Sequence, residues 1–278
     1  MGTGKRGQPR SGLEGEAMGF RGAIFDVDGV LVDSPHERAW RESLQELMEN
    51  DWREVAEQTT YRPELFTTAV YQAVMAGKPR ASGARSALEY FHVPEAEDRA
   101  TQYGERKQQR VVELIEAGQF HAFPDALRFV LAVKGTGLPL AVASSSKNAG
   151  LFLTRIRLDV FAAERGLPYG FIGDGLTLQQ IFDADLSGRD FEHGKPDPTI
   201  FLTAAAELSL PPERCFVVED ASAGVQAARA GAMGALGVAR MQDQALLREA
   251  GADLVVTSLD EVAVDALSRS RLERGSMS

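Results

Sequence analysis

Two aspartates lie two residues apart where an apolar run ends, in the segment FDVDGVLVDS at residues 25–34. If the run forms a strand, Asp26 and Asp28 share one face, because side chains alternate along a strand. Gly29 allows the backbone to bend directly after them. A carboxylate pair at such a bend can supply a nucleophile and an acid or base. The alternative is a plain turn after a strand, for which Asp-Gly is a common sequence.

A second carboxylate pair, Glu219 and Asp220, ends the apolar run CFVVED. Parallel strands bring their carboxyl ends to one edge of a sheet, so we expect both pairs to converge there. Like charges this close need a compensating cation, and hard oxygen ligands suit Mg²⁺. The sequence therefore predicts a Mg²⁺ site made by Asp26, Asp28, Glu219 and Asp220. The alternative for the second pair is to cap the helix that is predicted to follow.

A serine cluster follows a third apolar run, in the segment LAVASSSKN. Hydroxyls and backbone N–H groups at the start of a helix form a natural phosphate site, although such a cluster can also simply cap the helix. We predict phosphoryl or substrate contacts from Ser144, Ser145, Ser146, Lys147 and Asn148.

Lys195 lies between Gly194 and Pro196 in the segment HGKPDP, a rigid and non-helical turn. A lysine fixed in this turn can neutralise a phosphoryl group and the nucleophile together. The alternative is a solvated surface lysine, the common fate of a single lysine.

Elements that could position these residues are evident along the chain. Short apolar runs that end in polar clusters and open helical patterns predict buried parallel strands. These runs lie at 22–26, 138–144, 215–220, 235–239 and 253–257. The pattern predicts an α/β fold with a doubly wound, Rossmann-like parallel sheet in three layers, with ligands at the carboxyl ends of its strands.

Residues 35–120 break this rhythm, because they carry amphipathic helical stretches and no buried strand. We predict that this interval is an inserted small helical cap domain. Ser34, Pro35 and Glu37 indicate a capping box at the start of its first helix. The predicted organisation is a disordered tail at 1–18, a core domain at 19–34 and 121–278, and the cap at 35–120. The stretch 159–180 lengthens one connection of the sheet, and the sequence assigns it no role.

Composition narrows the class of protein. The 278 residues carry a net charge of -10, which argues against nucleic acid as a partner. The single cysteine argues for a reducing compartment. Residues 1–18 lack the apolar stretch that is typical of a secretory signal, and no run of about 18 apolar residues is present to span a bilayer. We expect a soluble, cytoplasmic monomer with no membrane partner, in which local cations attract any anionic substrate.

Taken in order, the four motifs resemble the haloacid dehalogenase superfamily of aspartate-nucleophile phosphotransferases, from about residue 22 to residue 258. The resemblance implies that Asp26 is the nucleophile and Asp28 the general acid and base. It implies that Ser144 contacts the phosphoryl group and that Lys195 neutralises charge. The implied cofactor is Mg²⁺, held by Asp26, the backbone carbonyl of Asp28 and Asp220, with Glu219 as a ligand or a neighbour of the ligands. An aspartyl-phosphate intermediate follows from these roles.

Within this superfamily, the motifs SSSKN, GKPDPTIF and VVEDASAGVQAARAGAM are most similar to the β-phosphoglucomutases and their sugar-phosphatase relatives. In those caps an arginine binds phosphate and a lysine faces the substrate, and the matching residues are Arg80 and Lys107. The alternative for both is an ordinary solvated side chain.

The mutases usually place a hinge histidine four residues after the Ser or Thr that ends the first motif, where this chain has Arg38. His36 is offset by two residues, and its alternative role is that of a first-turn helix residue. We therefore expect a phosphatase that acts on a small sugar phosphate. A β-phosphoglucomutase-type phosphomutase is the alternative, and a non-catalytic sugar-phosphate sensor is a further one.

Overall fold

The computed structural model describes residues 19–75 and 78–275. The predicted disordered tail at 1–18 lies outside the described residues. The described chain divides into two compact units, one made of residues 19–31 with 123–275 and the other of residues 32–122. We refer to them as the sheet unit and the helical unit.

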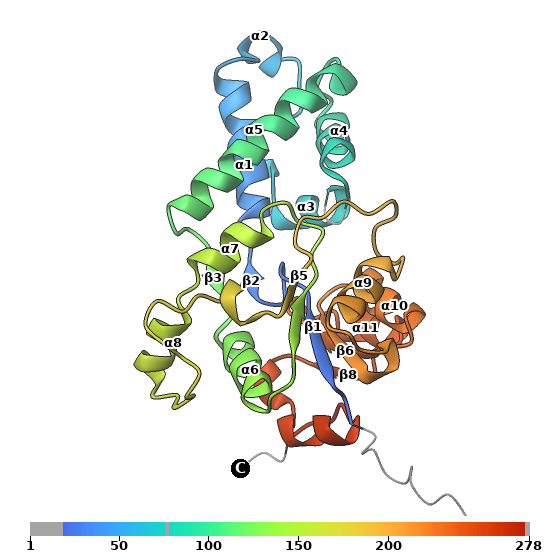
Figure 1. Cartoon of the computed structure of the whole chain (residues 1–278). Helices are drawn as coiled ribbons and strands as arrows, with labels where there is room; N and C mark the ends of the chain where they lie inside the picture. Colours follow the sequence, from blue (N-terminus) through green and yellow to red (C-terminus); the bar gives the residue numbers. More distant parts are fainter. Residues whose placement is uncertain (1–18, 76–77, 276–278) are drawn as a thin grey trace, which may run out of the picture. The chain divides into compact units, whose positions relative to one another are not determined.

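The sheet unit is built on six parallel strands in the order β5-β4-β1-β6-β7-β8 (Figure 1). The strands are β1 (Gly22–Phe25), β4 (Leu140–Val142), β5 (Ala184–Asp185), β6 (Cys215–Glu219), β7 (Gly234–Val238) and β8 (Leu254–Val256). The five predicted strands are present. The sequence missed β5, because a strand of two residues leaves no apolar run to recognise.

Helices cover both faces of this sheet (Figure 1). On one face Ile24 belongs to the same buried cluster as Ile200 and Phe201. On the other face the Phe25 ring contacts the Phe129 ring, with centroids 6.1 Å apart. The helices of the unit are α6 (Pro124–Gly135), α7 (Ala149–Arg155), α8 (Leu158–Arg165), α9 (Thr199–Glu207), α10 (Ser222–Ala230) and α11 (Gln244–Glu249). The predicted three-layer α/β fold is confirmed.

Short 3₁₀ segments complete the sheet unit, namely η2 (Gln179–Ile181), η3 (Pro212–Arg214), η4 (Leu259–Glu261) and η5 (Val264–Arg269). The stretch 159–180 contains most of α8 and a loop that Asp159 fixes by accepting the Gly175 N–H at 2.8 Å. Hydrogen bonds from Arg157 and Gly175 hold the pKa of Asp159 well below its ordinary value. The charged Asp159 carboxylate thus stabilises the loop through its hydrogen bond with the Gly175 N–H.

The strand register brings the ends of three strands together. Phe25 of β1 aligns with Val142 of β4 and with Val218 of β6. The next residue, Asp26, donates its N–H to the Val218 carbonyl at 3.1 Å, and Ala143 donates to the Phe25 carbonyl at 2.8 Å. The residues that follow these strands therefore emerge side by side at the carboxyl edge of the sheet.

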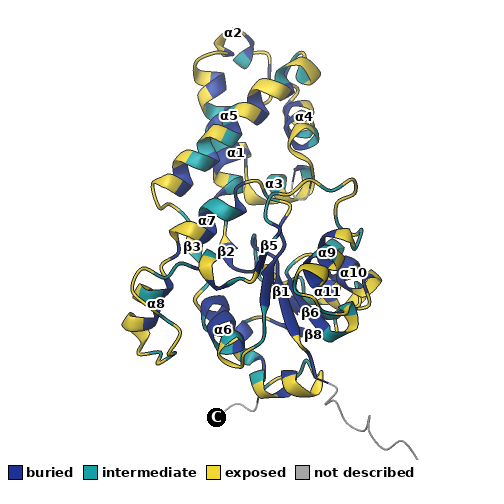
Figure 2. Cartoon of the chain, viewed as in Figure 1, coloured by how far each residue is buried: buried dark blue, intermediate teal, exposed yellow. Residues whose placement is uncertain are grey.

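In its described residues, 32–75 and 78–122, the helical unit contains five α-helices around its own core. They are α1 (His36–Glu49), α2 (Arg53–Ala56), α3 (Thr68–Val74), α4 (Arg80–Tyr90) and α5 (Ala96–Glu116), with η1 (Pro63–Leu65) and a short antiparallel pair of β2 (Val32–Asp33) and β3 (His121–Ala122). Tyr103, fully buried, packs edge-on against Trp40 and donates its hydroxyl to the Trp40 carbonyl at 2.9 Å. Figure 2 shows buried positions along α1, α4 and α5, whereas α3 has no buried residue.

The predicted capping box at the start of α1 is wrong. The N-cap residue is Pro35, and no side chain caps the helix. Pro35 occupies the N-cap position that was predicted for Ser34, so the helix begins one residue later than predicted. Glu37 accepts a hydrogen bond from the Thr68 hydroxyl at 2.9 Å instead of reaching back.

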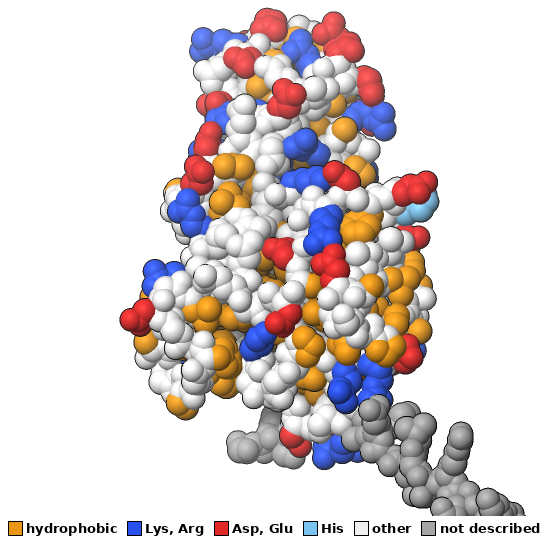
Figure 3. Space-filling view, viewed as in Figure 1, with side chains coloured by type: hydrophobic (Ala, Val, Ile, Leu, Met, Phe, Trp, Pro, Cys, Tyr) orange, Lys and Arg blue, Asp and Glu red, His pale blue; other side chains and the backbone are white. Residues whose placement is uncertain are grey.

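Charged side chains of both signs are interspersed over the helical unit (Figure 3). Arg106 on α5 pairs with Glu46 on α1 at 2.5 Å, and Arg110 pairs with Glu42 at 2.6 Å. Among residues 19–75 and 78–275, no helix is both long enough and apolar enough to cross a membrane.

Candidate active site

Lys195 lies at the centre of the candidate site. Its ammonium donates to Asp26 Oδ1 and to Glu219 Oε1, each at 2.6 Å, and to the Ala143 carbonyl at 3.4 Å. The ammonium also lies 4.8 Å from the centroid of the Phe201 ring. Only 14% of the Lys195 side chain is exposed, so the solvated surface lysine is excluded.

The Lys195 charge is held between two carboxylates. Burial alone would lower the pKa of Lys195, but the charges of Asp26 and Glu219 raise it above its ordinary value. The lysine therefore remains a cation and neutralises part of the negative charge at the edge of the sheet.

Asp26 directly follows β1, and its side chain is almost fully buried. Burial raises its pKa to about 7, an effect that Lys195 opposes and that Glu219 and Asp28 strengthen. A carboxylate in this environment has more negative charge around it than one lysine can balance. It can attack an electrophile when a further cation or a phosphoryl group binds beside it.

Glu219, the last residue of β6, has both carboxylate oxygens engaged. Oε1 accepts from Lys195, and Oε2 accepts the backbone N–H groups of Asp220 and Ala221, each at 3.1 Å. Its side chain is 2% exposed. The Asp220 and Ala221 N–H groups precede α10, whose N-cap residue Ala221 has no side-chain cap. The Glu219 carboxylate therefore accepts backbone N–H groups at the end of the strand, and neither Glu219 nor Asp220 caps α10 with its side chain.

Asp220 lies against the turn that follows Asp28. The residue after Asp28, Gly29, has a positive φ of 79°, and a Cβ added there would lie 1.9 Å from Asp220 Oδ2. The backbone of the turn and the Asp220 carboxylate are thus in direct contact. Burial and the charges of Glu219 and Asp26 raise the pKa of Asp220 well above its ordinary value.

These carboxylates were the predicted metal site. Among the described residues, no group of three or more His, Cys, Asp or Glu side chains is arranged to hold a metal ion. The chemistry of the donor set does fit a hard divalent cation, because oxygen ligands and excess negative charge gather on one edge. The Asp220 carboxylate also lies directly against the backbone of the turn that follows Asp28, at Gly29.

The serine cluster follows β4, on the other side of β1 from Glu219. Ser144 is buried, and its hydroxyl accepts the Ser146 N–H at 3.2 Å; the Ser146 hydroxyl accepts the Asn148 N–H at 3.3 Å. No side chain caps α7, whose N-cap residue is Asn148. Ser145 is exposed. The two hydroxyls therefore shape the loop, with Ser144 at the sheet edge.

Lys147 points elsewhere. Its ammonium donates to the Gly188 carbonyl at 2.8 Å and pairs with Asp190. The loop that follows β5 thus holds this lysine, which was predicted to bind substrate.

In the helical unit, Lys107 is buried and His36 is its neighbour. The Lys107 ammonium lies 3.3 Å from His36 Nδ1 and 5.2 Å from the centroid of the Trp40 ring. Arg38, which stands where a hinge histidine was expected, is exposed and pairs with Glu42 at 2.6 Å. The histidine that contacts Lys107 is therefore His36. The spacing of four residues after Ser34, which identified position 38 as the hinge, could not reveal this contact.

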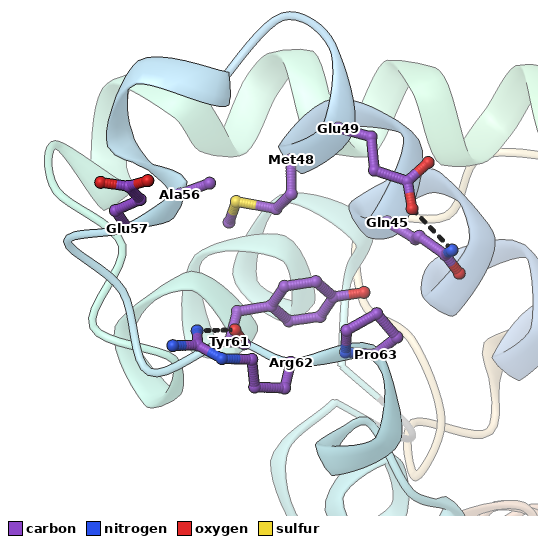
Figure 4. A pocket seen from close by; sticks show the side chains of 8 residues that line it. All are labelled: Gln45, Met48, Glu49, Ala56, Glu57, Tyr61, Arg62 and Pro63. Atoms are coloured by element: carbon purple, nitrogen blue, oxygen red, sulfur yellow. Dashed lines mark hydrogen bonds between the residues drawn. The ribbon is translucent and has the colours of Figure 1, made fainter.

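Arg80 opens α4 and is exposed. One of its guanidinium nitrogens donates to Gln108 Oε1 at 3.2 Å. A cavity of about 310 Å³ lies elsewhere in the same unit, between α1, α2 and η1 (Figure 4). Met48, Ala56, Tyr61 and Pro63 give it apolar walls, and Gln45, Glu49, Glu57 and Arg62 also line it. None of the predicted site residues lines it.

Comparison with known proteins decides the family. The chain matches the haloacid dehalogenase-like hydrolase family over residues 20–231. The chain belongs to this family. That confirms the predicted superfamily and, with it, the predicted class of enzyme, a phosphatase or phosphomutase.

Similar proteins include enzymes of both kinds. The chain is 34% identical to a β-phosphoglucomutase of Mycobacterium bovis, over 91% of this chain and 95% of that one. It is 28% identical to hexitol phosphatase A of Escherichia coli, over 89% and 95% of the two chains. Among solved structures, an archaeal β-phosphoglucomutase from Pyrococcus matches with a TM-score of 0.65 and 29% identity, over 90% of this chain and 99% of that one.

A further residue at this edge of the sheet, Arg240, was not predicted from the sequence. Arg240 follows β7, and its side chain donates to the carbonyls of Gly29 and Val30, at 3.2 and 3.3 Å. An arginine directly after an apolar strand, in the segment GVAR, was the signal that could have identified it.

Proposed function

We propose that this family member catalyses Mg²⁺-dependent phosphoryl transfer on a small sugar phosphate, as a phosphomutase of the β-phosphoglucomutase type. The observation that carries the proposal is the pairing of buried Lys195 with both Asp26 and Glu219 at 2.6 Å. Phosphoryl transfer depends on placement and charge compensation more than on covalent chemistry by several groups. The sheet edge provides both.

In the proposed reaction an Asp26 oxygen attacks the phosphorus atom and the bond to the leaving oxygen breaks. Lys195 keeps Asp26 in place and offsets its charge. Asp28 donates a proton to the leaving oxygen. It later takes one from the acceptor hydroxyl, whose oxygen attacks the phosphorus atom as the bond to Asp26 breaks. Ser144, at the end of the neighbouring strand, contributes a hydroxyl to the phosphoryl group.

A bound Mg²⁺ would be held by Asp26, the Asp28 carbonyl and Asp220, and would neutralise the charge of the phosphoryl group. Both Glu219 oxygens already have partners. This supports a role for Glu219 in holding Lys195 rather than as a metal ligand.

Two observations favour a sugar hydroxyl over water as the acceptor. The expectation of hydrolysis depended on the absence of a hinge histidine, whereas His36 Nδ1 lies 3.3 Å from buried Lys107. The chain also shares 34% identity with a β-phosphoglucomutase over nearly its whole length. Hydrolysis of a sugar phosphate is the second candidate, and the similarity to hexitol phosphatase A supports it. Arg80 remains a predicted phosphate ligand.

The test uses purified protein with Mg²⁺ and β-glucose 1-phosphate, with and without β-glucose 1,6-bisphosphate. We expect glucose 6-phosphate that depends on the bisphosphate, with little free phosphate. Phosphate release without glucose 6-phosphate would support the second candidate instead. Asp26→Asn should abolish turnover, whereas Asp98→Asn, which changes an exposed carboxylate in the first turn of α5, should not. Full turnover by Asp26→Asn would refute the nucleophile.

A further inference from the structure

Arg240 contacts four residues of the sheet unit through a single guanidinium group. Nε donates to the Gly29 carbonyl at 3.2 Å, Nη2 to the Val30 carbonyl at 3.3 Å, and Nη1 to Asp125 Oδ2 at 2.9 Å. The guanidinium carbon lies 3.9 Å from the centroid of the Phe123 ring. Only 15% of the Arg240 side chain is exposed.

Asp125, the carboxylate that binds the Arg240 guanidinium, is itself held by hydrogen bonds. Asp125, in the first turn of α6, accepts the Leu259 N–H at 2.8 Å and the Ser258 hydroxyl at 3.2 Å on the same oxygen that binds Arg240. The Asp125 side chain is 10% exposed. A buried carboxylate with three donors holds the guanidinium in one orientation.

The other two acceptors belong to the turn that carries Asp28. The Leu31 N–H closes this turn by donating to the Val27 carbonyl at 2.9 Å. Arg240 binds the carbonyls of the two residues between Asp28 and Leu31, so the position of the turn depends on the guanidinium as well as on its own backbone bond.

The same contacts lie where the chain leaves and re-enters the sheet unit. Leu31 is the last residue before the helical unit and Phe123 the first after it, and Phe123 donates its N–H to the Leu31 carbonyl at 3.0 Å. Arg240 thus contacts the outgoing segment through Gly29 and Val30 and the returning segment through Phe123 and Asp125.

We propose that Arg240 is a positioning residue that, through the turn after Asp28, holds the Asp28 carboxyl where it can reach the leaving oxygen. The inference builds on the proposed function, in which Asp28 protonates that oxygen as the phosphorus–oxygen bond breaks. Three acceptors in different directions require a planar group with several donors, so lysine cannot replace arginine here.

The experiment compares two phosphoryl donors. The leaving alkoxide of β-glucose 1,6-bisphosphate needs a proton, whereas the phenolate of 4-nitrophenyl phosphate leaves without one. For Arg240→Lys we expect kcat/KM with the bisphosphate to fall about 30-fold and kcat/KM with 4-nitrophenyl phosphate to fall less than about threefold. Asp125→Asn should shift the ratio of the two kcat/KM values in the same direction, by a smaller factor.

The ratio of the two kcat/KM values does not depend on how much of a variant is folded, so a less stable variant still gives an answer. Arg128→Lys is the matched control, because Arg128 lies on α6 near Asp125 and pairs with Asp260 instead of the turn; its ratio should equal that of the wild type. Equal losses with both donors in Arg240→Lys would overturn the inference. A wild-type protein that uses neither donor would instead refute the proposed function.

Discussion

Gly224 on α10 offers a direct test of the Glu219 carboxylate, because a single methyl group there would displace it. A Cβ at position 224 would lie 1.9 Å from both Cδ and Oε1 of Glu219. Ordinary contact begins near 3.4 Å, so the carboxylate must move by about 1.5 Å or the helix must shift. Movement of the carboxylate stretches the 2.6 Å contact between Glu219 and Lys195, and a shift of α10 disturbs the hydrogen bond from the N-cap residue Ala221 to Glu219 Oε2.

The magnitude follows from two opposing effects. Replacing glycine by alanine inside a helix normally stabilises it by about 1 kcal/mol. Breaking a buried ion pair costs about 3–5 kcal/mol, and a displaced carboxylate loses a large part of that. We therefore expect Gly224→Ala to lower the free energy of unfolding by about 1–3 kcal/mol. We also expect kcat/KM to fall at least about tenfold, because Lys195 loses one of the two carboxylates that hold it.

Urea unfolding and steady-state kinetics measure the two effects. The control is Gly150→Ala in α7, where an added Cβ meets nothing within 4 Å; this variant should be as stable as the wild type or slightly more so, with unchanged activity. If Gly224→Ala matched Gly150→Ala in both measurements, Glu219 would not be fixed as described and its role in holding Lys195 would be refuted.

Three further predictions concern other parts of the molecule. Burial raises the pKa of the Cys215 thiol to about 12, so about one thiol in ten thousand is ionised at pH 8; a thiol reagent should titrate one cysteine in urea and none in buffer, and fast labelling of the folded protein would contradict the burial. Burial alone would raise the pKa of Asp125, but hydrogen bonds from Arg240 and the Leu259 backbone hold it below its ordinary value. Its contribution to stability is therefore present above about pH 4 and is lost as the pH falls further; urea midpoints between pH 5 and pH 3 should drop more steeply for the wild type than for Asp125→Asn, and parallel curves would contradict this. Finally, His36→Asn should lower the ratio of phosphoryl transfer to glucose 1-phosphate over transfer to water about tenfold. Arg38→Ala should leave this ratio unchanged. The reverse result would show that Arg38, and not His36, is the hinge residue.

Most of the fold could be predicted because it depends on local patterns. Apolar runs such as CFVVE are buried over their whole length, and burial on both faces is what a run without alternation encodes. The strand β5 and the start of α1 were missed or misplaced for local reasons as well. A strand of two residues has no pattern, and Pro35 occupies the N-cap position itself.

The site was predictable only in part. Asp26 and Glu219 end neighbouring strands, so the register alone brings them together. The Lys195 contacts depend on the path of the long loop before α9, which no periodicity encodes. The partners of Lys147, His36 and Arg240 likewise lie far away in the sequence. Side-chain direction on loops and at helix starts is decided by tertiary contacts, and a single sequence does not reveal these.

The paired ends of the helical unit have an evolutionary consequence. Val32 and Asp33 pair with Ala122 and His121 in the two-residue strands β2 and β3, so the inserted segment begins and ends at adjoining points of the chain. Such an insertion can be exchanged, lengthened or shortened without altering the register of the parallel sheet. A lineage could thus acquire new substrate preferences by replacing one contiguous gene segment of about 90 codons, while Asp26, Glu219 and Lys195 continued to evolve under separate constraints.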